Sequence, residues 1–454
     1  MAKNLAENKL MQRQEDEGMI ARFFRFTEHG TTYRRETTAG MTTFLAMAYI
    51  LFVNPAILAE AGMDKGAVFT ATALSAVVGC LLMALVANYP VAIAPSMGLN
   101  AFFAFSVVIG MGIPWQTALV GVLFSGIIFV IITMLKIREM ILNAIPQDLK
   151  MASASGIGLF IAFIGLKGSG IVVPSEATLV TLGNLTSPTT LLTIFGLVVS
   201  IVLMVRNVPG GIFFGMVLTA LVGIFAGIIP TPDRIVGAVP SLEPIFGVSI
   251  SQMFTAPDQV FTLNLLVVVL TFLFVEFFDT AGTLMAVATQ AGLIKNNKMP
   301  RASRALFADS SSIVAGAILG TSPTTAYIES SSGVAAGGRT GFSSVVTAAL
   351  FVLALFFSPL LVVVTSNVTA PALIIVGVLM VSVLGNINWG KFEIAVPAFL
   401  MMAAMPLTYS IANGIALGLV LYPITMVVKG RAKELHPIMY GLFVIFILYF
   451  AFLS

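Results

Sequence analysis

Long runs of apolar residues, separated by short stretches with glycine, proline or charge, extend along almost the whole chain. A helix of about 20 apolar residues is long enough to cross the hydrocarbon core of a bilayer. Runs of this kind predict fourteen membrane segments, at 37–58, 67–87, 91–109, 115–135, 147–170, 190–205, 210–229, 261–290, 303–319, 322–337, 342–361, 369–385, 394–407 and 411–428. They form two sets of seven. Because seven is odd, the second set must be inverted relative to the first, so the pattern predicts an all-α polytopic membrane protein with a 7+7 inverted repeat.

Two of these runs are interrupted near their start. The third opens with VAIAPSMGLN (91–100) and the tenth with TSPTTAYIE (321–329). Pro95 and Pro323 prevent a continuous helix, so each run predicts a short extended piece followed by a half-helix. Both runs are third in their set, and interrupted segments at matching positions are typical of transporters with a site at the membrane midplane. Re-entrant loops or proline-kinked helices that bind nothing are the alternative.

The basic residues sort to one side of the predicted membrane. With the N-terminus in the cytoplasm, 20 of the 23 Lys and Arg residues lie inside, and Lys65, Lys167 and Arg234 lie outside. This bias is the positive-inside rule, and it predicts a multi-pass protein of the cytoplasmic (inner) membrane. It also places 230–260 outside and the basic loop 292–304 inside. The apolar stretch 435–453 either crosses once more or lies in the interface.

Composition excludes several function classes. The chain is 58% hydrophobic and 9% charged, with a mean hydropathy of +1.03, whereas soluble domains are about one quarter charged. Its two histidines, His29 and His436, lie near the termini, and Cys80 is the only cysteine. We therefore expect no metal and no cofactor. The sequence contains no phosphate-binding GxxxxGK[ST] motif and no nucleophile–base pair within the runs, so we expect a gradient-driven transporter and not an enzyme.

Four carboxylates fall within the apolar runs away from their ends, namely Glu276, Asp279, Asp309 and Glu329. A carboxylate at bilayer depth costs at least a few kcal/mol and is a candidate for function. Glu276 and Asp279 are three residues apart and share a helix face, which Thr283 continues. Two close carboxylates repel, so one tends to hold a proton, as proton coupling requires. A buried ion pair is the alternative, but the runs contain no Lys or Arg away from their ends.

The interrupted runs carry further candidates. Glu329 stands where the tenth run becomes helical and is followed by small residues; it either binds a ligand at the half-helix N-terminus or only caps that helix. Asn100 has the matching place in the third run and either binds a ligand of mixed polarity or caps its helix. Phe102 beside it could stack on a flat ring. Asp309 lies near the basic loop and could instead pair with Arg304 or cap its own helix.

Four motifs resemble those of a known family. They are AGMTTFLAMAYILFVNP (39–55), APSMGLNAFFAF (94–105), FVEFFDTAGTLMAVATQAGL (274–293) and GTSPTTAYIESSSGVAAGGRTG (320–341). They closely resemble the purine-base permeases of the nucleobase–cation symporter-2 family, in its adenine/guanine/hypoxanthine branch. The resemblance runs from about Thr31 to Lys429.

The resemblance implies fourteen segments divided between a core domain and a gate domain. Segments 3 and 10 would carry short antiparallel strands before their half-helices. The implied divisions are a cytoplasmic segment (1–36), core (37–135 and 261–361), gate (136–229 and 362–430), an external loop (230–260) and a C-terminal apolar segment (431–454).

The resemblance also implies residue roles and partners. In that family the positions that match Glu276, Asp279, Glu329 and Asn100 contribute to base binding or proton coupling. We expect the base to be bound by Glu276, Glu329, Asn100, Phe102 and Thr43, and protons to be coupled by Asp279 and Glu276. Some family members have a neutral amide at the position of Glu276. The expected partners are a purine nucleobase, a proton and the lipid bilayer, without nucleic acid, and a homodimer is the candidate assembly.

We therefore expect proton-coupled uptake of purine bases, with guanine and hypoxanthine favoured over adenine. These bases differ by a donor–acceptor swap at the six position, which the sequence does not resolve. An anion exchanger or channel of the sulphate/bicarbonate type on the same fold is the alternative. It predicts a basic site, and the intramembrane carboxylates argue against it because they would repel an anion.

Overall fold

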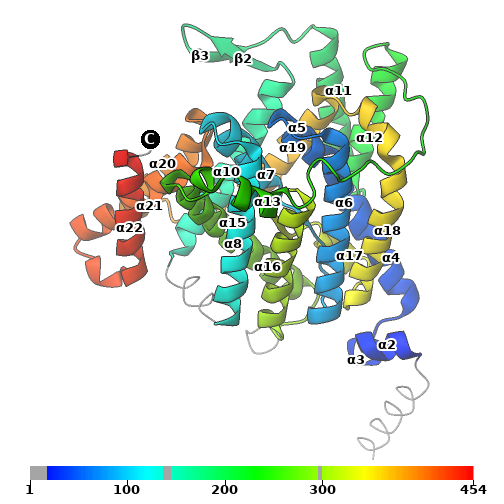
Figure 1. Ribbon diagram of the computed structural model, residues 1–454, viewed down its shortest axis with the longest axis horizontal. Helices are drawn as coiled ribbons and strands as arrows, with labels where there is room; N and C mark the ends of the chain where they lie inside the picture. Colours follow the sequence, from blue (N-terminus) through cyan, green and yellow to red (C-terminus); the bar gives the residue numbers. More distant parts are fainter. Residues whose placement is uncertain (1–17, 136–144, 295–298, 453–454) are drawn as a thin grey trace, which may run out of the picture.

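The structure is a computed structural model that describes residues 18–135, 145–294 and 299–452. The chain is predominantly helical (Figure 1). Eight of the described helices are long and apolar enough to cross a membrane, and several shorter apolar helices accompany them. Each of the fourteen predicted runs contains a helix, in agreement with the hydropathy pattern.

The helices of the first half are α2 (Met19–Phe24), α3 (Phe26–His29), α4 (Tyr33–Met47), α5 (Ile50–Glu60), α6 (Lys65–Leu82), α7 (Met97–Ala101), α8 (Trp115–Met134), α10 (Gln147–Gly168), α11 (Pro188–Val205) and α12 (Gly211–Phe225). Those of the second half are α13 (Val248–Thr255), α14 (Pro257–Val260), α15 (Leu263–Gln290), α16 (Ala302–Leu319), α17 (Ser330–Ala335), α18 (Gly341–Ala354), α19 (Ser366–Val381), α20 (Phe392–Leu407), α21 (Ile411–Val428) and α22 (Pro437–Phe452). Short π-helical stretches at Met83–Ala87 and Phe102–Gly110 extend α6 and α7, and 3₁₀ stretches at Leu355–Val363 and Ser382–Asn386 extend α18 and α19.

The two interrupted runs have the predicted form. Strand β1 (Ile93–Pro95) precedes α7, and strand β4 (Thr324–Ala326) precedes α17. The strands pair antiparallel, with Ala94 opposite Thr325. Pro95 and Pro323 lie where the chain is extended, because proline cannot donate the hydrogen bond that a helix needs there. The prediction of a strand and a half-helix in segments 3 and 10 is therefore confirmed.

The described helices pack into two groups. The first group contains α4 to α8 and α15 to α18, with α8 packed on α16 and α18 packed on α4 and α6. The second group contains α10, α11, α12, α19, α20 and α21, with its largest contact between α10 and α19. That contact is close because a Cβ on Gly377 would lie 2.5 Å from the carbonyl oxygen of Gly158, and small residues allow helix backbones to approach in membranes.

The molecule has two ends along the helix axes. At one end lies the hairpin of β2 (Val172–Ser175) and β3 (Leu179–Leu182), and at the other lie α2 and α3 (Figure 1). We call them the hairpin end and the N-terminal end. The loop 230–260 packs on the first helix group, where the Gly237 N–H donates to the Phe356 carbonyl (2.9 Å) and the Ser249 hydroxyl donates to the Ala317 carbonyl (2.9 Å).

The C-terminal apolar stretch forms α22, which packs on α21. Its buried face carries Met439, Leu442 and Phe446, and the Phe446 ring lies 6.0 Å from that of Phe274 on α15. Ahead of α22, the Arg431 guanidinium contacts the carboxylates of Glu393 (2.8 Å) and Glu434 (2.6 Å). These contacts fix the turn between α21 and α22.

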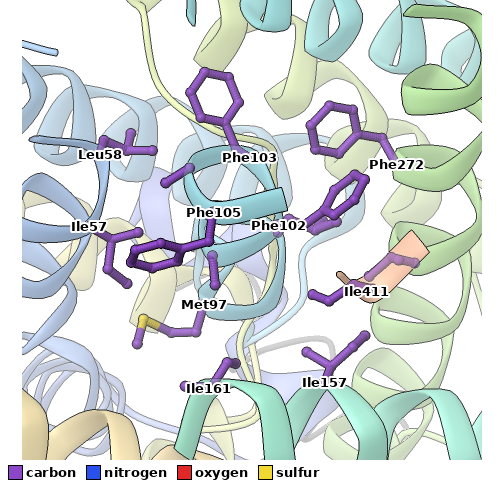
Figure 2. Close-up of a cluster of buried hydrophobic side chains, with 14 of the residues drawn as sticks. Ile57, Leu58, Met97, Phe102, Phe103, Phe105, Ile157, Ile161, Phe272 and Ile411 are labelled. Atoms are coloured by element: carbon purple, nitrogen blue, oxygen red, sulfur yellow. The ribbon is translucent and has the colours of Figure 1, made fainter. Parts of the chain in front are cut away.

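A hydrophobic cluster joins the two helix groups at the third segment. Figure 2 shows Met97, Phe102 and Phe105 among side chains of α5, α10 and α15. Phe102 points toward Phe272, with ring centroids 5.1 Å apart and nearly perpendicular planes. This cluster fills the space between the groups on the hairpin side of β1.

Candidate functional site

The two half-helices begin side by side because β1 and β4 hold their starts together. The Ser96 N–H donates to the Pro323 carbonyl (2.8 Å), and the Tyr327 N–H donates to the Ala92 carbonyl (2.9 Å). The Ser330 hydroxyl accepts from the Ala92 N–H (3.0 Å). The N-termini of α7 and α17 therefore meet within the molecule, with their free N–H groups and positive dipole ends in one region.

A small cavity, which we call the inner cavity, lies at this meeting point. It has a volume of about 70 Å³. It is lined by Tyr49, Ser96, Met97, Gly98, Thr283, Thr325, Ala326, Tyr327, Ile328, Glu329, Val376 and Met380. Val376 and Met380 come from α19, so the second helix group closes a site that the first group builds. Typical ligand sites are about 300–1,000 Å³, so the inner cavity is smaller than a ligand site in this conformation.

A second cavity continues from the same site toward the N-terminal end. It has a volume of about 370 Å³, and we call it the lower vestibule. Its walls include Asn207 between α11 and α12, Gln290 at the end of α15, and Ser332 of α17. Glu329 lines both cavities. Its carboxylate therefore stands where the lower vestibule meets the inner cavity.

Glu329 is held by a tyrosine of the first segment. The Tyr49 hydroxyl, between α4 and α5, donates a hydrogen bond to the Glu329 carboxylate over 2.5 Å. Glu329 occupies the N-cap position of α17, but its side chain makes no capping hydrogen bond. The carboxylate is thus directed to Tyr49 and to the cavities. It does not cap α17, so the alternative that Glu329 only caps its helix is wrong.

A buried cluster of carboxyl and hydroxyl groups lies next to β4. The Thr280 hydroxyl oxygen is 2.9 Å from Glu276 Oε1, 2.9 Å from Asp309 Oδ2 and 3.0 Å from the Thr325 hydroxyl. Glu276, Thr280 and Asp309 are almost fully buried. A hydroxyl has one proton to donate and otherwise accepts. The two carboxyl groups therefore share the single proton of the Thr280 hydroxyl.

The sequence-predicted site residues fall in different places. Glu329 and Thr283 line the inner cavity, and Glu276 lies in the cluster behind β4. The backbone of Asp279 belongs to α15, but its side chain lies outside the described residues. The paired role predicted for Glu276 and Asp279 therefore stays a prediction.

Three other candidates lie behind the cavity. The Asn100 amide is fully buried and donates to Asn54 Oδ1 (3.0 Å). The Phe102 ring packs on Phe272, and Thr43 lies against Gly333 of α17, where an added Cβ would be 2.0 Å from its hydroxyl oxygen. None of the three is among the described residues that line the inner cavity or the lower vestibule. Direct contact with a base stays a prediction for each.

Several residues of the site are not among those predicted from the sequence. Tyr49 and Tyr327 are the aromatic side chains among the described residues that line the inner cavity. Asn54 joins segments 1, 2 and 10, because its amide donates to the hydroxyls of Thr72 (2.8 Å) and Thr321 (3.0 Å). A polar Asn and a Tyr within an apolar run were the available signals.

Sequence comparisons place this chain among permeases. The Xan_ur_permease model, described as the permease family, matches residues 34–417. The guanine/hypoxanthine permease PbuG of Bacillus subtilis is 64% identical over 441 residues, which cover 95% of this chain and 99% of that protein. The adenine permease AdeP of Escherichia coli is 44% identical over 440 residues, 96% of this chain and 97% of that protein.

Solved structures share the fold at much lower identity. The transmembrane domain of the cyanobacterial bicarbonate transporter BicA matches with a TM-score of 0.64 at 17% identity, over 84% of this chain and 97% of that one. SLC26A9 matches with a TM-score of 0.61 at 9% identity, over 87% of this chain and 65% of that one. These likenesses give the fold alone, which is the 7+7 inverted repeat that the sequence predicts.

Proposed function

We propose, from the premise that the chain belongs to the nucleobase–cation symporter-2 family of permeases, that it imports purine nucleobases together with protons. The chain is a multi-pass membrane transporter and not an enzyme. The base, the proton and the direction are the parts proposed here. The contacts of Glu329 support the choice of base, and the contacts of the buried carboxyl pair support the proton.

The observation that carries the proposal is the position of Glu329. Its carboxylate lies between the inner cavity and the lower vestibule, fixed by the Tyr49 hydroxyl. A carboxylate accepts hydrogen bonds only, so it suits a ligand edge with ring N–H groups, as purines have. Tyr49 and Tyr327 line the same cavity and offer ring faces to a flat ligand.

Guanine and hypoxanthine are the proposed bases. PbuG, named a guanine/hypoxanthine permease, is 64% identical to this chain, and AdeP, named an adenine permease, is 44% identical. The oxo group at position six of guanine and hypoxanthine leaves the neighbouring ring nitrogen protonated. That N–H can donate to Glu329, whereas adenine has an acceptor at the same position.

The buried carboxyl pair is the proposed proton site. Glu276 and Asp309 share the Thr280 hydroxyl, and Thr280 also contacts Thr325 of β4. Protonation or deprotonation of the pair changes which groups donate in this cluster. Because Thr325 also lines the inner cavity, the change reaches the wall of the base site. Asp279 and Glu276 remain our candidates from sequence, and Asp309 joins them.

Transport would proceed by movement between the two helix groups. We take the first group as the core domain and the second as the gate domain, with the bounds given above. In this conformation Glu329 is reached through the lower vestibule, while Met97, Phe105 and Ile57 belong to the hydrophobic cluster between the two helix groups (Figure 2). With the N-terminus in the cytoplasm, this is an inward-open arrangement. A homodimer is the proposed assembly.

The anion-transporter alternative makes a different prediction about competition. Uptake of radiolabelled hypoxanthine by cells that lack purine transport should be inhibited by unlabelled guanine and should not respond to sulphate or bicarbonate. Expression of the Glu329→Gln variant is the matched control, because it keeps the shape of the side chain and removes its charge. Competition by sulphate without any effect of purines would replace this proposal by the anion exchanger.

A further inference from the structure

We infer that the chain has a second binding site for the nucleobase, in a cavity around Tyr409 at the hairpin end. This inference rests on the proposed function. The cavity has a volume of about 300 Å³, which is the lower limit for ligand sites and suits a small bicyclic ring. Its walls come from both helix groups, with Glu60 and Phe105 on one side and Lys167, Ser366, Thr369 and Tyr409 on the other. We call it the Tyr409 cavity.

Aromatic rings form the inner part of this cavity. The rings of Tyr409 and Phe105 have centroids 5.9 Å apart, at 79°, and the Phe160 ring of α10, which is not among the described residues that line the cavity, lies 5.4 Å from that of Tyr409. Phe105 is buried, and Tyr409 is half-buried. A flat base that enters from the hairpin end therefore meets an aromatic surface on which it can stack.

Polar groups form the rim. Glu60, Lys167 and Ser366 are exposed, and the Lys167 ammonium lies 4.7 Å from the centroid of the Tyr409 ring. Burial and the nearby Glu60 carboxylate raise the pKa of the Tyr409 hydroxyl, so this hydroxyl remains a donor. A base with one N–H and one oxo group on the same edge can donate to Glu60 while Lys167 or Tyr409 donates to its oxygen.

The backbone at Tyr409 is also unusual. Tyr409 has φ of 53°, in the left-handed region that bulky residues avoid. Such strain persists where the surrounding structure holds it, and it is concentrated at ligand clamps and switch regions. Here the contacts with Phe105, Phe160 and Lys167 hold the ring between the two helix groups.

The Tyr409 cavity and the inner cavity lie on one path. They share no lining residue, but two elements line both in succession. Along α19, Thr369 and Leu373 line the Tyr409 cavity, and Val376 and Met380, one turn further on, line the inner cavity. In the third segment, Phe105 lines the Tyr409 cavity and Met97 lines the inner cavity. Both belong to the cluster in Figure 2. A base that moves from the Tyr409 cavity to Glu329 would therefore pass this cluster.

Thiol labelling can test the Tyr409 cavity separately from Glu329. The only native cysteine, Cys80, is fully buried, so Ser366→Cys places one exposed thiol at the rim. The measurement is the rate at which a membrane-impermeant maleimide labels this thiol in sealed cells, with and without saturating hypoxanthine. It is made in the parent and in a Glu329→Gln background.

We expect hypoxanthine to slow labelling in both backgrounds. In Tyr409→Leu, the hypoxanthine concentration needed for this protection should rise about tenfold, which is the equivalent of one stacking contact. Glu60→Gln should weaken it as well, which covers the case in which Tyr409→Leu does not fold. The matched controls Tyr440→Leu and Glu176→Gln, which change exposed residues away from the cavity, should leave protection unchanged.

Two results would overturn the inference. The first is protection that disappears with Glu329→Gln, or that survives both Tyr409→Leu and Glu60→Gln. Either outcome would show that the thiol responds only to binding elsewhere, and the proposed function would stand without a second site. If the parent neither takes up hypoxanthine nor is protected by it, the proposed function fails, and the second site fails with it.

Discussion

The Tyr49 hydroxyl and the Glu329 carboxylate are joined by a hydrogen bond of 2.5 Å across 280 residues of sequence. The bond connects the junction of α4 and α5 to the N-terminus of α17 and fixes the carboxylate between the two cavities. Hydrogen bonds to charged groups are the stronger kind, so this pair sets the orientation of the group that we propose to bind the base.

Removal of the Tyr49 hydroxyl should therefore weaken base binding without abolishing it. For Tyr49→Phe we expect a loss of affinity for hypoxanthine of about tenfold, because one charge-assisted hydrogen bond is lost while the ring remains. Equilibrium binding to the purified protein measures it. Tyr440→Phe, on the exposed face of α22, is the control. Unchanged affinity in Tyr49→Phe would mean that Glu329 is oriented by other contacts.

Thr280 should be required for proton coupling more than for binding. Its hydroxyl is the contact shared by Glu276 and Asp309. Thr280→Val keeps the shape of the side chain and removes the hydroxyl, so we expect exchange of base across the membrane to persist while accumulation driven by a pH gradient is reduced. Thr280→Ser restores the hydroxyl and should restore accumulation. Counterflow and accumulation in the same liposomes separate the two effects.

If Thr280→Val accumulates base as the parent does, the hydroxyl is not part of the coupling machinery. The carboxylates are then tested directly with Asp279→Asn, Glu276→Gln and Asp309→Asn. Each of these mimics a carboxyl that stays protonated, and loss of accumulation with retained exchange is the expected result for a coupling residue.

Gly333 should tolerate no side chain. A Cβ at this position of α17 would lie 2.0 Å from the Thr43 hydroxyl oxygen and 2.6 Å from the Ala39 carbonyl oxygen. Overpacking of this kind typically costs about 1–3 kcal/mol, and here it would also displace the helix that begins at Glu329. We expect Gly333→Ala to lower both the thermal midpoint in detergent and the affinity for hypoxanthine. Gly441→Ala, where a Cβ has no neighbour within 4 Å, should change neither.

The charge bias predicts the orientation, and paired cysteine variants measure it. Ser241→Cys lies in the loop 230–260 and Ser303→Cys near the start of α16, both at exposed positions. An impermeant reagent added outside should label Ser241→Cys only, since basic residues gather in the cytoplasm. Lys298 of the basic loop is outside the described residues, so Ser303 represents this side. Labelling of Ser303→Cys from outside would invert the topology.

Local sequence was sufficient for much of the fold. Pro95 and Pro323 interrupt apolar runs at matching places, and the strands β1 and β4 lie where these prolines predict them. Glu329 also stood out, because a carboxylate in an apolar run is costly. Each of these features is a property of a few consecutive residues, which is why it could be predicted without a structure.

The partners of these residues could not be predicted in the same way. Tyr49 and Glu329, or Thr280 and Asp309, come together only when segments from different parts of the chain pack. Asp309 lies near a basic loop in sequence, but in the structure it is buried against Thr280 while Arg304 is exposed. Phe102 has the sequence position expected of a stacking residue, yet its ring packs on Phe272, because its direction depends on how α15 packs.

The most direct test of the central claim is accumulation of radiolabelled hypoxanthine in liposomes that contain the purified protein, with the outside more acidic than the inside. The account predicts uphill accumulation by the parent, its collapse when a protonophore dissipates the gradient, and a loss of affinity in Glu329→Gln corresponding to about 1–3 kcal/mol. Equal uptake with and without the pH gradient, or unchanged affinity in Glu329→Gln, would contradict proton-coupled purine transport at this site.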